Sequence, residues 1–308
     1  MYHYIRAYST DLPNFNFLHI NDFKKQLDYF QEHYVLLSKE QFIHSIKERK
    51  PIANSIVLTF DDGLKDHYSY VLPELKKRGL FGIFYIPTLP YTEQKLLNVH
   101  RIHILLGAHP AERIYDALNN LIDDSMLTEC HKEKFSDKLY RKQENSSASQ
   151  KVKELLNYHI DYIYRETTLD KLMQTFFPDE ATLAKSFYMT EKELQAMQDT
   201  GMLIGSHADS HSVMSKLSPQ EQYHEIHNSF SFLEQTLQKP ECKTFCYPYG
   251  GFHTFTNDTE ALLNKEDVVF SFNVDSRDIT ANDIKNRPQA LPRYDCNEFE
   301  YGKVYRNS

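Results

Sequence analysis

The chain has 308 residues, enough for one large α/β domain or two ordinary ones with an ample core. Its formal net charge of -8 and the lack of a basic stripe argue against a nucleic-acid partner. No apolar run approaches the roughly 20 residues needed to cross a bilayer, so we expect no transmembrane segment.

The N-terminus carries a prediction about location. Met1-Tyr2-His3-Tyr4 leads straight into an expected strand, with neither a basic nor an apolar leader before it. The four cysteines have neither zinc-finger spacing nor the density of a disulfide framework. Both features predict a cytoplasmic protein with reduced thiols, unless a leader has been trimmed away.

Helical and β-type patterns alternate in the first part of the chain. Phe23, Leu27 and Phe30 fall on one face of a predicted helix. The stretch Ser38-Lys39-Glu40-Gln41 is a capping-box pattern that starts the next helix. The apolar run from Ser55 to Phe60 then predicts a strand.

That strand ends at Asp61-Asp62-Gly63, where two adjacent carboxylates precede a glycine. Ligands of helix-covered parallel sheets bind at the carboxyl ends of the strands, so charged residues there often belong to a site. Neighbouring like charges are tolerated best when one binds a cation and the other shares a proton. Asp-Asp-Gly is also ordinary turn chemistry, so the pair alone leaves a surface turn open.

The pattern changes between Pro87 and Thr190, where helical periodicity with charge replaces β-type runs. We therefore predict a helical insertion over residues 96–189, set into a domain formed by residues 1–95 and 190–308. The insertion is a candidate lid or a recognition element for a substrate or partner. A peripheral decoration or a dimer contact is the alternative. The predicted insertion has two apolar stripes, formed by Ile114, Leu118 and Leu121, and by Val152, Leu155, Leu156 and Ile160.

A second possible site follows the predicted strand Gly201 to Ser206. His207 and His211 come just past its end and can converge on one ion if the intervening residues form a turn or a first helical turn. Two neutral imidazoles and one carboxylate form a three-ligand set for Zn²⁺ or a similar divalent ion, with a position open for water. In a chain with fifteen histidines, chance spacing is the alternative.

The last third returns to alternation. Ser218-Pro219-Gln220-Glu221 is a strong helix start, and an apolar stripe of Ile226, Phe230, Leu233 and Leu237 follows it. We expect strands separated by helices, and therefore a parallel sheet that closes into a barrel. The expected strands lie at Tyr4, Ile56, Ile83, Leu203, Phe245 and Phe270, the last running from Val268 to Val274.

Three motifs in this order resemble those of the polysaccharide deacetylase family, also called the NodB-homology or carbohydrate esterase family 4 group. They are Thr59-Phe60-Asp61-Asp62-Gly63, His207 to His211, and Phe245-Cys246-Tyr247-Pro248-Tyr249-Gly250, whose Tyr-Pro-Tyr-Gly is similar to one branch of the family. The resemblance covers most of residues 1–95 and 190–300. It implies an α/β fold, namely a distorted TIM-like (β/α)7 barrel, here with a helical insertion.

The resemblance also implies roles for individual residues. Asp61 corresponds to the general base, and Asp62, His207 and His211 correspond to the metal ligands. Pro248 and Tyr249 belong to the third motif, in which the backbone N–H after the proline donates to the oxyanion. The ion would lower the pKa of its water and polarise the amide carbonyl, while Asp61 takes the proton of the water.

Two departures from the family pattern concern the partners of the base. Cys246 stands where an arginine usually steadies the catalytic aspartate, and the usual late histidine, the proton donor to the amine, is missing after Leu291. We consider Arg293 a candidate to steady the base or to contact the substrate and its oxyanion. Tyr294 and His253 are candidate proton donors.

Together these features predict a metal-dependent hydrolase that removes an N-acetyl group from an amino sugar. The substrate would be a polysaccharide or a lipid- or nucleotide-linked glycan precursor. The cofactor would be a divalent ion, with zinc favoured over cobalt, nickel or manganese. A deformylase or an O-acetyl esterase could use the same site, and a sugar-binding pseudoenzyme is the alternative from another class.

Overall fold

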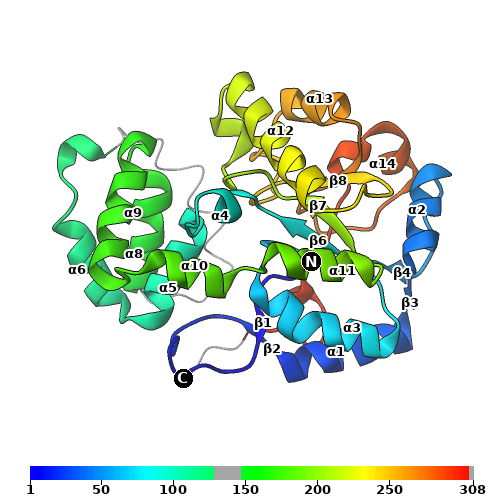
Figure 1. The fold of residues 1–308 in the computed structure, drawn as a ribbon, viewed down its shortest axis with the longest axis horizontal. Helices are drawn as coiled ribbons and strands as arrows, with labels where there is room; N and C mark the ends of the chain where they lie inside the picture. Colours follow the sequence, from blue (N-terminus) through cyan, green and yellow to red (C-terminus); the bar gives the residue numbers. More distant parts are fainter. Residues whose placement is uncertain (128–146, 305–308) are drawn as a thin grey trace. The chain divides into compact units, whose positions relative to one another are not determined.

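The computed structural model describes residues 1–127 and 147–304 and divides the chain into two compact units (Figure 1). The first unit is built from Met1–Ala7, Phe17–Lys95 and the described part of Ala184–Tyr305. The second contains Tyr8–Asn16 and the described part of Leu96–Leu183.

A five-stranded parallel sheet forms the centre of the first unit. Its order follows the chain, since each strand pairs with the next one in sequence. Ile83, Tyr85 and Phe270 of this sheet are fully buried and belong to one core cluster. The strands are β5 (Leu58–Phe60), β6 (Gly82–Ile86), β7 (Leu203–Ser206), β8 (Lys243–Cys246) and β9 (Val268–Phe272).

Two further segments extend this sheet at its edges. Tyr2 pairs in parallel with Phe60, and Leu291 pairs in parallel with Phe272. The two added segments also meet each other, because the Met1 amine donates to the Tyr294 carbonyl at 2.7 Å. Seven parallel segments therefore form a closed ring, which confirms the α/β class and the distorted barrel.

The prediction of a single strand from Ser55 to Phe60 was wrong. Ser55–Ile56 (β4) pairs with Val35–Leu36 (β3) in a separate small sheet, and only Leu58–Phe60 enters the barrel. The chain changes partner at Val57, so the apolar pattern continues although the strand does not. A third small sheet joins β1 (Ile5–Arg6) to β2 (Leu18–His19).

The expected end of the last strand was also wrong, by two residues. Strand β9 ends at Phe272 instead of Val274. The Val274 N–H leaves the ladder and donates to the Gly250 carbonyl at 2.8 Å. This bond ties the end of β9 to the loop that follows β8.

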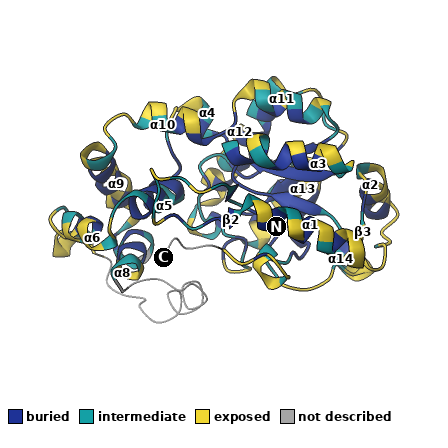
Figure 2. Cartoon of the chain, turned by 90° about the horizontal axis from the view of Figure 1, so that it is seen from below, coloured by how far each residue is buried: buried dark blue, intermediate teal, exposed yellow. Residues whose placement is uncertain are grey.

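Helices cover the barrel, and their exposed residues lie on the outward faces of α1 and α3 in Figure 2. The capping box predicted at Ser38 is present, and the helix start predicted at Ser218 is confirmed and also forms a capping box. The side chains of Phe23, Leu27 and Phe30 are buried. The helices of this unit are α1 (Ile20–His33), α2 (Lys39–Lys47), α3 (Leu72–Arg78), α4 (Leu89–Thr92), α11 (Glu191–Asp199), α12 (Pro219–Thr236), α13 (Asn257–Lys265) and α14 (Ala281–Asn286). In the predicted stripe of α12, Leu237 lies at the C-cap and is only partly buried.

Between Leu96 and Leu183, the described part of the second unit is mainly helical. Its core includes Ile114 and Leu118 and the fully buried side chain of Arg101. Glu180 accepts two hydrogen bonds from that guanidinium, at 2.7 and 2.8 Å, so the buried charge is paired. The helices are α5 (Asn98–Ala108), α6 (Ala111–Asn119), α8 (Ser147–Glu154) and α9 (Tyr162–Phe176), with α10 (Glu180–Phe187) at the return to the first unit. A role in covering the site or in recognition stays a prediction.

Candidate metal centre and active site

Three residues from two barrel strands bring their ligand atoms together. Asp62 follows β5, while His207 and His211 follow β7, and all three side chains are buried. Their ligand atoms lie within 4.8 Å of one another. The Nε2 atom of each imidazole lies 3.5 Å from the same oxygen, Oδ1 of Asp62.

This spacing suits a small divalent ion. Donor atoms at the roughly 2.1 Å that zinc prefers would lie about 3.4 Å apart in a tetrahedron. The measured 3.5 Å between Asp62 Oδ1 and each imidazole Nε2 is close to that separation. Two nitrogen donors and one oxygen donor also match a site with one position left for water. The residues present therefore fit a divalent ion.

The protonation of His207 suits a ligand. Its Nδ1 lies 2.7 Å from the carbonyl oxygen of Cys246, which can only accept, so the ring proton sits on Nδ1. The lone pair of Nε2 is then directed towards Asp62. Burial lowers the pKa of His207 and outweighs the nearby carboxylates of Asp61 and Asp62. The imidazole is therefore neutral near pH 7, as a metal ligand must be.

Asp61 lies beside this group but has a different partner. Arg293 donates two parallel hydrogen bonds to its carboxylate, 2.9 Å to Oδ1 and 2.8 Å to Oδ2. Burial alone would raise the pKa of Asp61, but the charge and hydrogen bonds of Arg293, with help from His207, lower it well below its usual range. The carboxylate is therefore ionised and fixed in orientation.

Arg293 uses all of its donors within the protein. Besides Asp61, it donates to Thr59 Oγ1 at 3.0 Å, to the Asn273 carbonyl at 3.2 Å and to Cys246 Sγ at 2.9 Å. A guanidinium has five N–H groups, and these contacts take each of them. Of the two roles we considered for Arg293, this geometry favours steadying the base over contact with the substrate or its oxyanion.

Cys246 completes the surroundings of the base. Its thiol lies 3.6 Å from Asp61 Oδ2, and burial raises its pKa well above the ordinary value. The group is therefore a neutral thiol that can donate to the carboxylate. An arginine placed at this position would compete for the space that the Arg293 guanidinium occupies, since Sγ and Nη2 are 2.9 Å apart.

The third motif places Tyr249 next to His211, a candidate metal ligand. Its ring centroid lies 5.0 Å from that of His211, and the preceding Pro248 is buried. Tyr249 has a φ of 63° and Gly250 a φ of 70°, so the chain makes a left-handed turn here. A Cβ on Gly250 would come within 2.3 Å of Val274, which explains the glycine.

Non-glycine residues with left-handed backbone gather at this site. Asp62 has a φ of 80°, His211 one of 59° and Ala208 one of 63°, in addition to Tyr249. Such conformations cost free energy and persist where surrounding contacts enforce them, often at functional sites. The structure therefore fixes the backbone of two of the three candidate ligands.

His3 is a site residue that we did not expect from the sequence. It follows Tyr2, whose carbonyl accepts a hydrogen bond from the Asp61 N–H at 2.9 Å, so it lies at the end of the neighbouring barrel segment. It is close enough to contribute to lowering the pKa of Asp61. The Nε2 atom of buried His67 donates to its carbonyl at 2.9 Å. The signal in the sequence was the stretch Tyr2-His3-Tyr4 near the start of the chain.

The two proton donors that we had considered have other surroundings. The hydroxyl of Tyr294 donates to Asp278 Oδ1 at 3.2 Å. His253 is exposed, and its carbonyl accepts a hydrogen bond from the Ser215 hydroxyl at 2.7 Å. His3, which lies close enough to Asp61 to lower its pKa, is a third candidate for this role.

The family model described as polysaccharide deacetylase matches residues 167–271 of this chain. The match covers about a third of the chain, which resembles the polysaccharide deacetylase family over this stretch. The matched stretch contains His207, His211 and Tyr249, whereas Asp61 and Arg293 lie outside it. The match supports a hydrolase of the deacetylase type, and the activity of that family generally depends on a metal.

Solved structures of other proteins share this fold. A Streptococcus pyogenes deacetylase, PplD, in complex with acetate has 15% identity and a TM-score of 0.57, over 95% of this chain and 88% of the other. IcaB from Ammonifex degensii has 15% identity and a TM-score of 0.55 over the same shares. A de-N-acetylase from Aggregatibacter actinomycetemcomitans has 13% identity and a TM-score of 0.51, over 95% and 92%. At these identities the similarity concerns the fold. No curated protein matches the chain.

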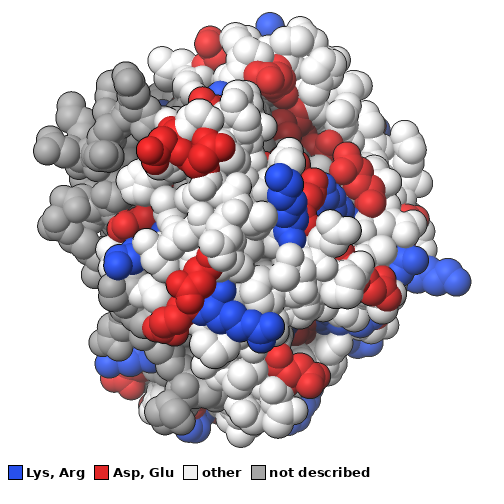
Figure 3. All heavy atoms as spheres, turned by 90° about the vertical axis from the view of Figure 1, so that its left-hand side faces the viewer, with Lys and Arg blue, Asp and Glu red and all other residues white. Residues whose placement is uncertain are grey.

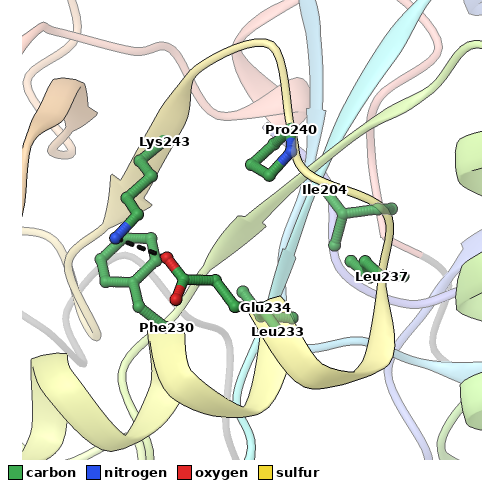
Figure 4. Close-up of a pocket in the computed structure, with 7 residues that line it drawn as sticks. All are labelled: Ile204, Phe230, Leu233, Glu234, Leu237, Pro240 and Lys243. Atoms are coloured by element: carbon green, nitrogen blue, oxygen red, sulfur yellow. Dashed lines mark ion pairs between the residues drawn. The ribbon is translucent and has the colours of Figure 1, made fainter.

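Elsewhere in the first unit, a small hollow lies between β7 and α12 (Figure 4). Its lining is apolar apart from the ion pair of Glu234 with Lys243, at 2.7 Å. Its volume of about 20 Å³ is room for one water molecule and far too small for a sugar. This hollow is therefore separate from the candidate site in both its residues and its chemistry.

The surface and the helices of the protein add two observations. On the face shown in Figure 3, basic side chains are scattered among acidic and uncharged ones and form no continuous stripe within the described part of the chain. No helix among the described residues is long and apolar enough to span a bilayer.

Proposed function

We propose that the chain is a metal-dependent deacetylase that removes an N-acetyl group from an amino sugar, in a polysaccharide or in a lipid- or nucleotide-linked glycan precursor. The observation that carries the proposal is the grouping of Asp62, His207 and His211 beside an Asp61 that is held separately by Arg293. The two neighbouring carboxylates thus have different partners, so that Asp62 can bind the ion while Asp61 takes a proton. Zinc is the ion we favour, because the donor set and spacing suit it, and cobalt, nickel and manganese are alternatives.

In this proposal Asp62, His207 and His211 would hold the ion. A divalent ion there supplies Lewis-acid chemistry, since it acidifies a water and polarises a carbonyl. Asp61 takes the proton of the attacking water. Because its pKa is held low, Asp61 is ionised throughout the neutral range but is a weak base, so it needs a water that has already been acidified.

Two further groups act on the substrate side. The Tyr249 N–H, in the turn after Pro248, is our candidate donor to the oxyanion that forms as the water attacks. His3 is our candidate donor of the proton to the departing amine, because an imidazole is a common general acid and His3 lies beside Asp61. Arg293 stays a positioning residue that keeps Asp61 ionised and aimed.

The test is to measure acyl release by the purified protein from matched sugars that differ only in the bond cleaved. The panel contains N-acetyl, N-formyl and O-acetyl amino sugars, as free oligosaccharides and as nucleotide-linked sugars. We expect acetate release from the N-acetyl sugars. Preferred release of formate would point to a deformylase, and cleavage of esters alone to an O-acetyl esterase. No release from any of them by the metal-loaded protein would leave a sugar-binding pseudoenzyme and overturn the proposal.

A further inference from the structure

The loop that carries both histidine ligands has an unusual backbone. It runs from His207 to His211 and forms neither helix nor strand. Ala208 and His211 have φ values of 63° and 59°, in the left-handed region that non-glycine residues rarely adopt. Contacts from outside the loop must therefore hold it in the shape that aims both imidazoles at Asp62.

Glu225 on α12 provides the largest set of these contacts. Its Oε2 atom accepts the backbone N–H groups of Asp209 at 3.0 Å and Ser210 at 2.8 Å. Its Oε1 atom accepts the hydroxyl of Ser210. One half-buried carboxylate thus binds the two residues midway between His207 and His211 through three charge-assisted hydrogen bonds, which are the strong kind.

A second residue of α12 supports the same loop one helical turn further on. Ser229 lies four residues after Glu225 and so on the same face of the helix. Its hydroxyl lies 2.6 Å from that of Ser206, which in turn accepts the Ala208 N–H at 3.2 Å. The helix therefore holds the loop at two points.

The far side of the loop is tied to the end of β6. The Asp209 carbonyl accepts the N–H groups of Thr88 at 3.1 Å and Leu89 at 3.0 Å, and the Thr88 hydroxyl donates to the Asp209 carboxylate. Asp209 is thus clamped between Thr88 on one side and Glu225 on the other. Neither clamp residue belongs to the ligand group itself.

We propose that Glu225 is a positioning residue that preorganises the loop from His207 to His211 for metal binding. The inference rests on the proposed metal site. Without the Glu225 carboxylate, the N–H groups of Asp209 and Ser210 lose their acceptor, and the loop is free to leave the left-handed conformations. Metal binding must then also order both imidazoles, at a cost in affinity. Residues that orient metal ligands typically contribute about 10–100-fold to metal affinity, and we expect a loss in this range for Glu225→Ala.

The experiment compares the metal affinity of Glu225→Ala with that of a control on the same helix. Glu221 lies one turn earlier and forms the capping box with Ser218, so Glu221→Ala weakens α12 without touching the loop. The dissociation constant for Zn²⁺ is measured by chelator competition, and the ligand geometry by the absorption spectrum of the Co²⁺-loaded proteins. Thermal unfolding of the metal-free proteins gives the loss of stability for each.

We expect Glu225→Ala to raise the Zn²⁺ dissociation constant about 10–100-fold and to alter the Co²⁺ spectrum. Glu221→Ala should lower the unfolding temperature and leave both metal readouts near wild type. Glu225→Gln keeps the shape of the side chain and one acceptor oxygen, so its Zn²⁺ dissociation constant should lie between those of wild type and Glu225→Ala. If the alanine variant does not fold, Glu225→Gln provides the test. Wild-type affinity in the Glu225 variants, or an equal loss in Glu221→Ala, would overturn the inference. A wild-type protein that binds no divalent ion would instead overturn the proposed metal site.

Discussion

Arg293 and Asp61 are joined by two parallel hydrogen bonds of 2.9 and 2.8 Å, although 232 residues separate them in the chain. The pair sits where the first and last segments of the barrel meet. Through it, the closure of the barrel fixes the proposed base. The arginine that is missing at Cys246 is thus supplied from another barrel segment.

The first prediction concerns removal of this partner. Arg293→Met leaves the buried Asp61 carboxylate without its cation, and we expect a loss of about 3–5 kcal/mol in the free energy of unfolding at pH 7. Because the folded pKa of Asp61 is lowered, the stabilisation is present above the unfolded pKa of about 4 and is lost as the pH falls below it. Denaturant unfolding of wild type and Arg293→Met at pH 7 and at pH 3 measures the loss of stability and its dependence on pH.

The control is Arg277→Met. Arg277 also pairs with a carboxylate, Asp283, but its side chain is 43% exposed. An exposed pair contributes little, so we expect less than about 1 kcal/mol. Equal losses for the two arginines would contradict a special role for the Arg293 pair.

The second prediction tests His3 as proton donor. In His3→Gln, we expect kcat for an N-acetyl sugar to fall about 10²–10⁴-fold, as for loss of a general acid, while metal content stays at the wild-type level. An aryl acetate has a leaving group that needs no protonation, so its hydrolysis should fall far less. Equal losses on the amide and the aryl ester would show that His3 does not act on the leaving group.

The same pair of substrates, the amide and the aryl ester, distinguishes His3 from the other two candidate proton donors. Tyr294→Phe removes only the hydroxyl that contacts Asp278, and His253→Gln changes an exposed imidazole. We expect both variants to keep kcat on the amide within about threefold of wild type, since a general acid would contribute far more. A loss confined to the amide substrate in either variant would transfer the role from His3 to that residue.

The third prediction concerns the buried His67. Burial lowers the pKa of His67 to about 4, while the Nε2–H of the neutral ring donates to the His3 carbonyl. Between pH 6.5 and 4 the unfolded chain binds a proton that the folded protein does not, so stability falls as the pH falls through this window. The shift corresponds to roughly 3 kcal/mol at pH 4.

His67→Gln removes the titration and keeps a donor for the His3 carbonyl. We expect the free energy of unfolding to depend less steeply on pH between 6.5 and 4 in this variant. His224→Gln, at an exposed position of α12, should leave the slope unchanged. A wild-type slope in His67→Gln would mean that His67 titrates normally in the folded protein.

The fourth prediction concerns the turn at Gly250. A methyl group there would meet Val274 at 2.3 Å, and the φ of 70° adds strain. Gly79 has a similar φ of 65°, and a methyl group added there would have nothing within 4 Å, so Gly79→Ala measures the backbone strain alone, about 1 kcal/mol. We expect Gly250→Ala to lose about 1–3 kcal/mol more, from the clash. Val274→Ala removes the nearest contact, so the double variant should recover part of this excess, and equal losses for the two glycines would rule out the clash.

The sequence predicted the residues whose position follows from local pattern. Asp62, His207 and His211 each stand just after a predicted strand, and parallel strands bring their carboxyl ends to one edge of a sheet. The helix starts at Ser38 and Ser218 were confirmed because capping boxes are local. These features need no knowledge of how the barrel closes.

What the sequence could not predict depends on closure and on tertiary contacts. The pairing of Tyr2 with the Asp61 strand, which brings His3 to the site, joins residues about 60 apart through the barrel edge. The break at Val57 was hidden because both halves of the run are apolar. Glu225 resembles any other acidic residue of a helix until its contacts with Asp209 and Ser210 are known.

The most direct test of the central claim is to measure zinc content and acetate release together in wild type, Asp61→Asn and His207→Ala. In the proposed mechanism Asp61 takes the proton and His207 binds the ion. We therefore expect about one zinc per chain in wild type and Asp61→Asn, zinc lost in His207→Ala, and activity reduced at least about 10²-fold in both variants. Full activity in Asp61→Asn, or undiminished zinc in His207→Ala, would contradict it.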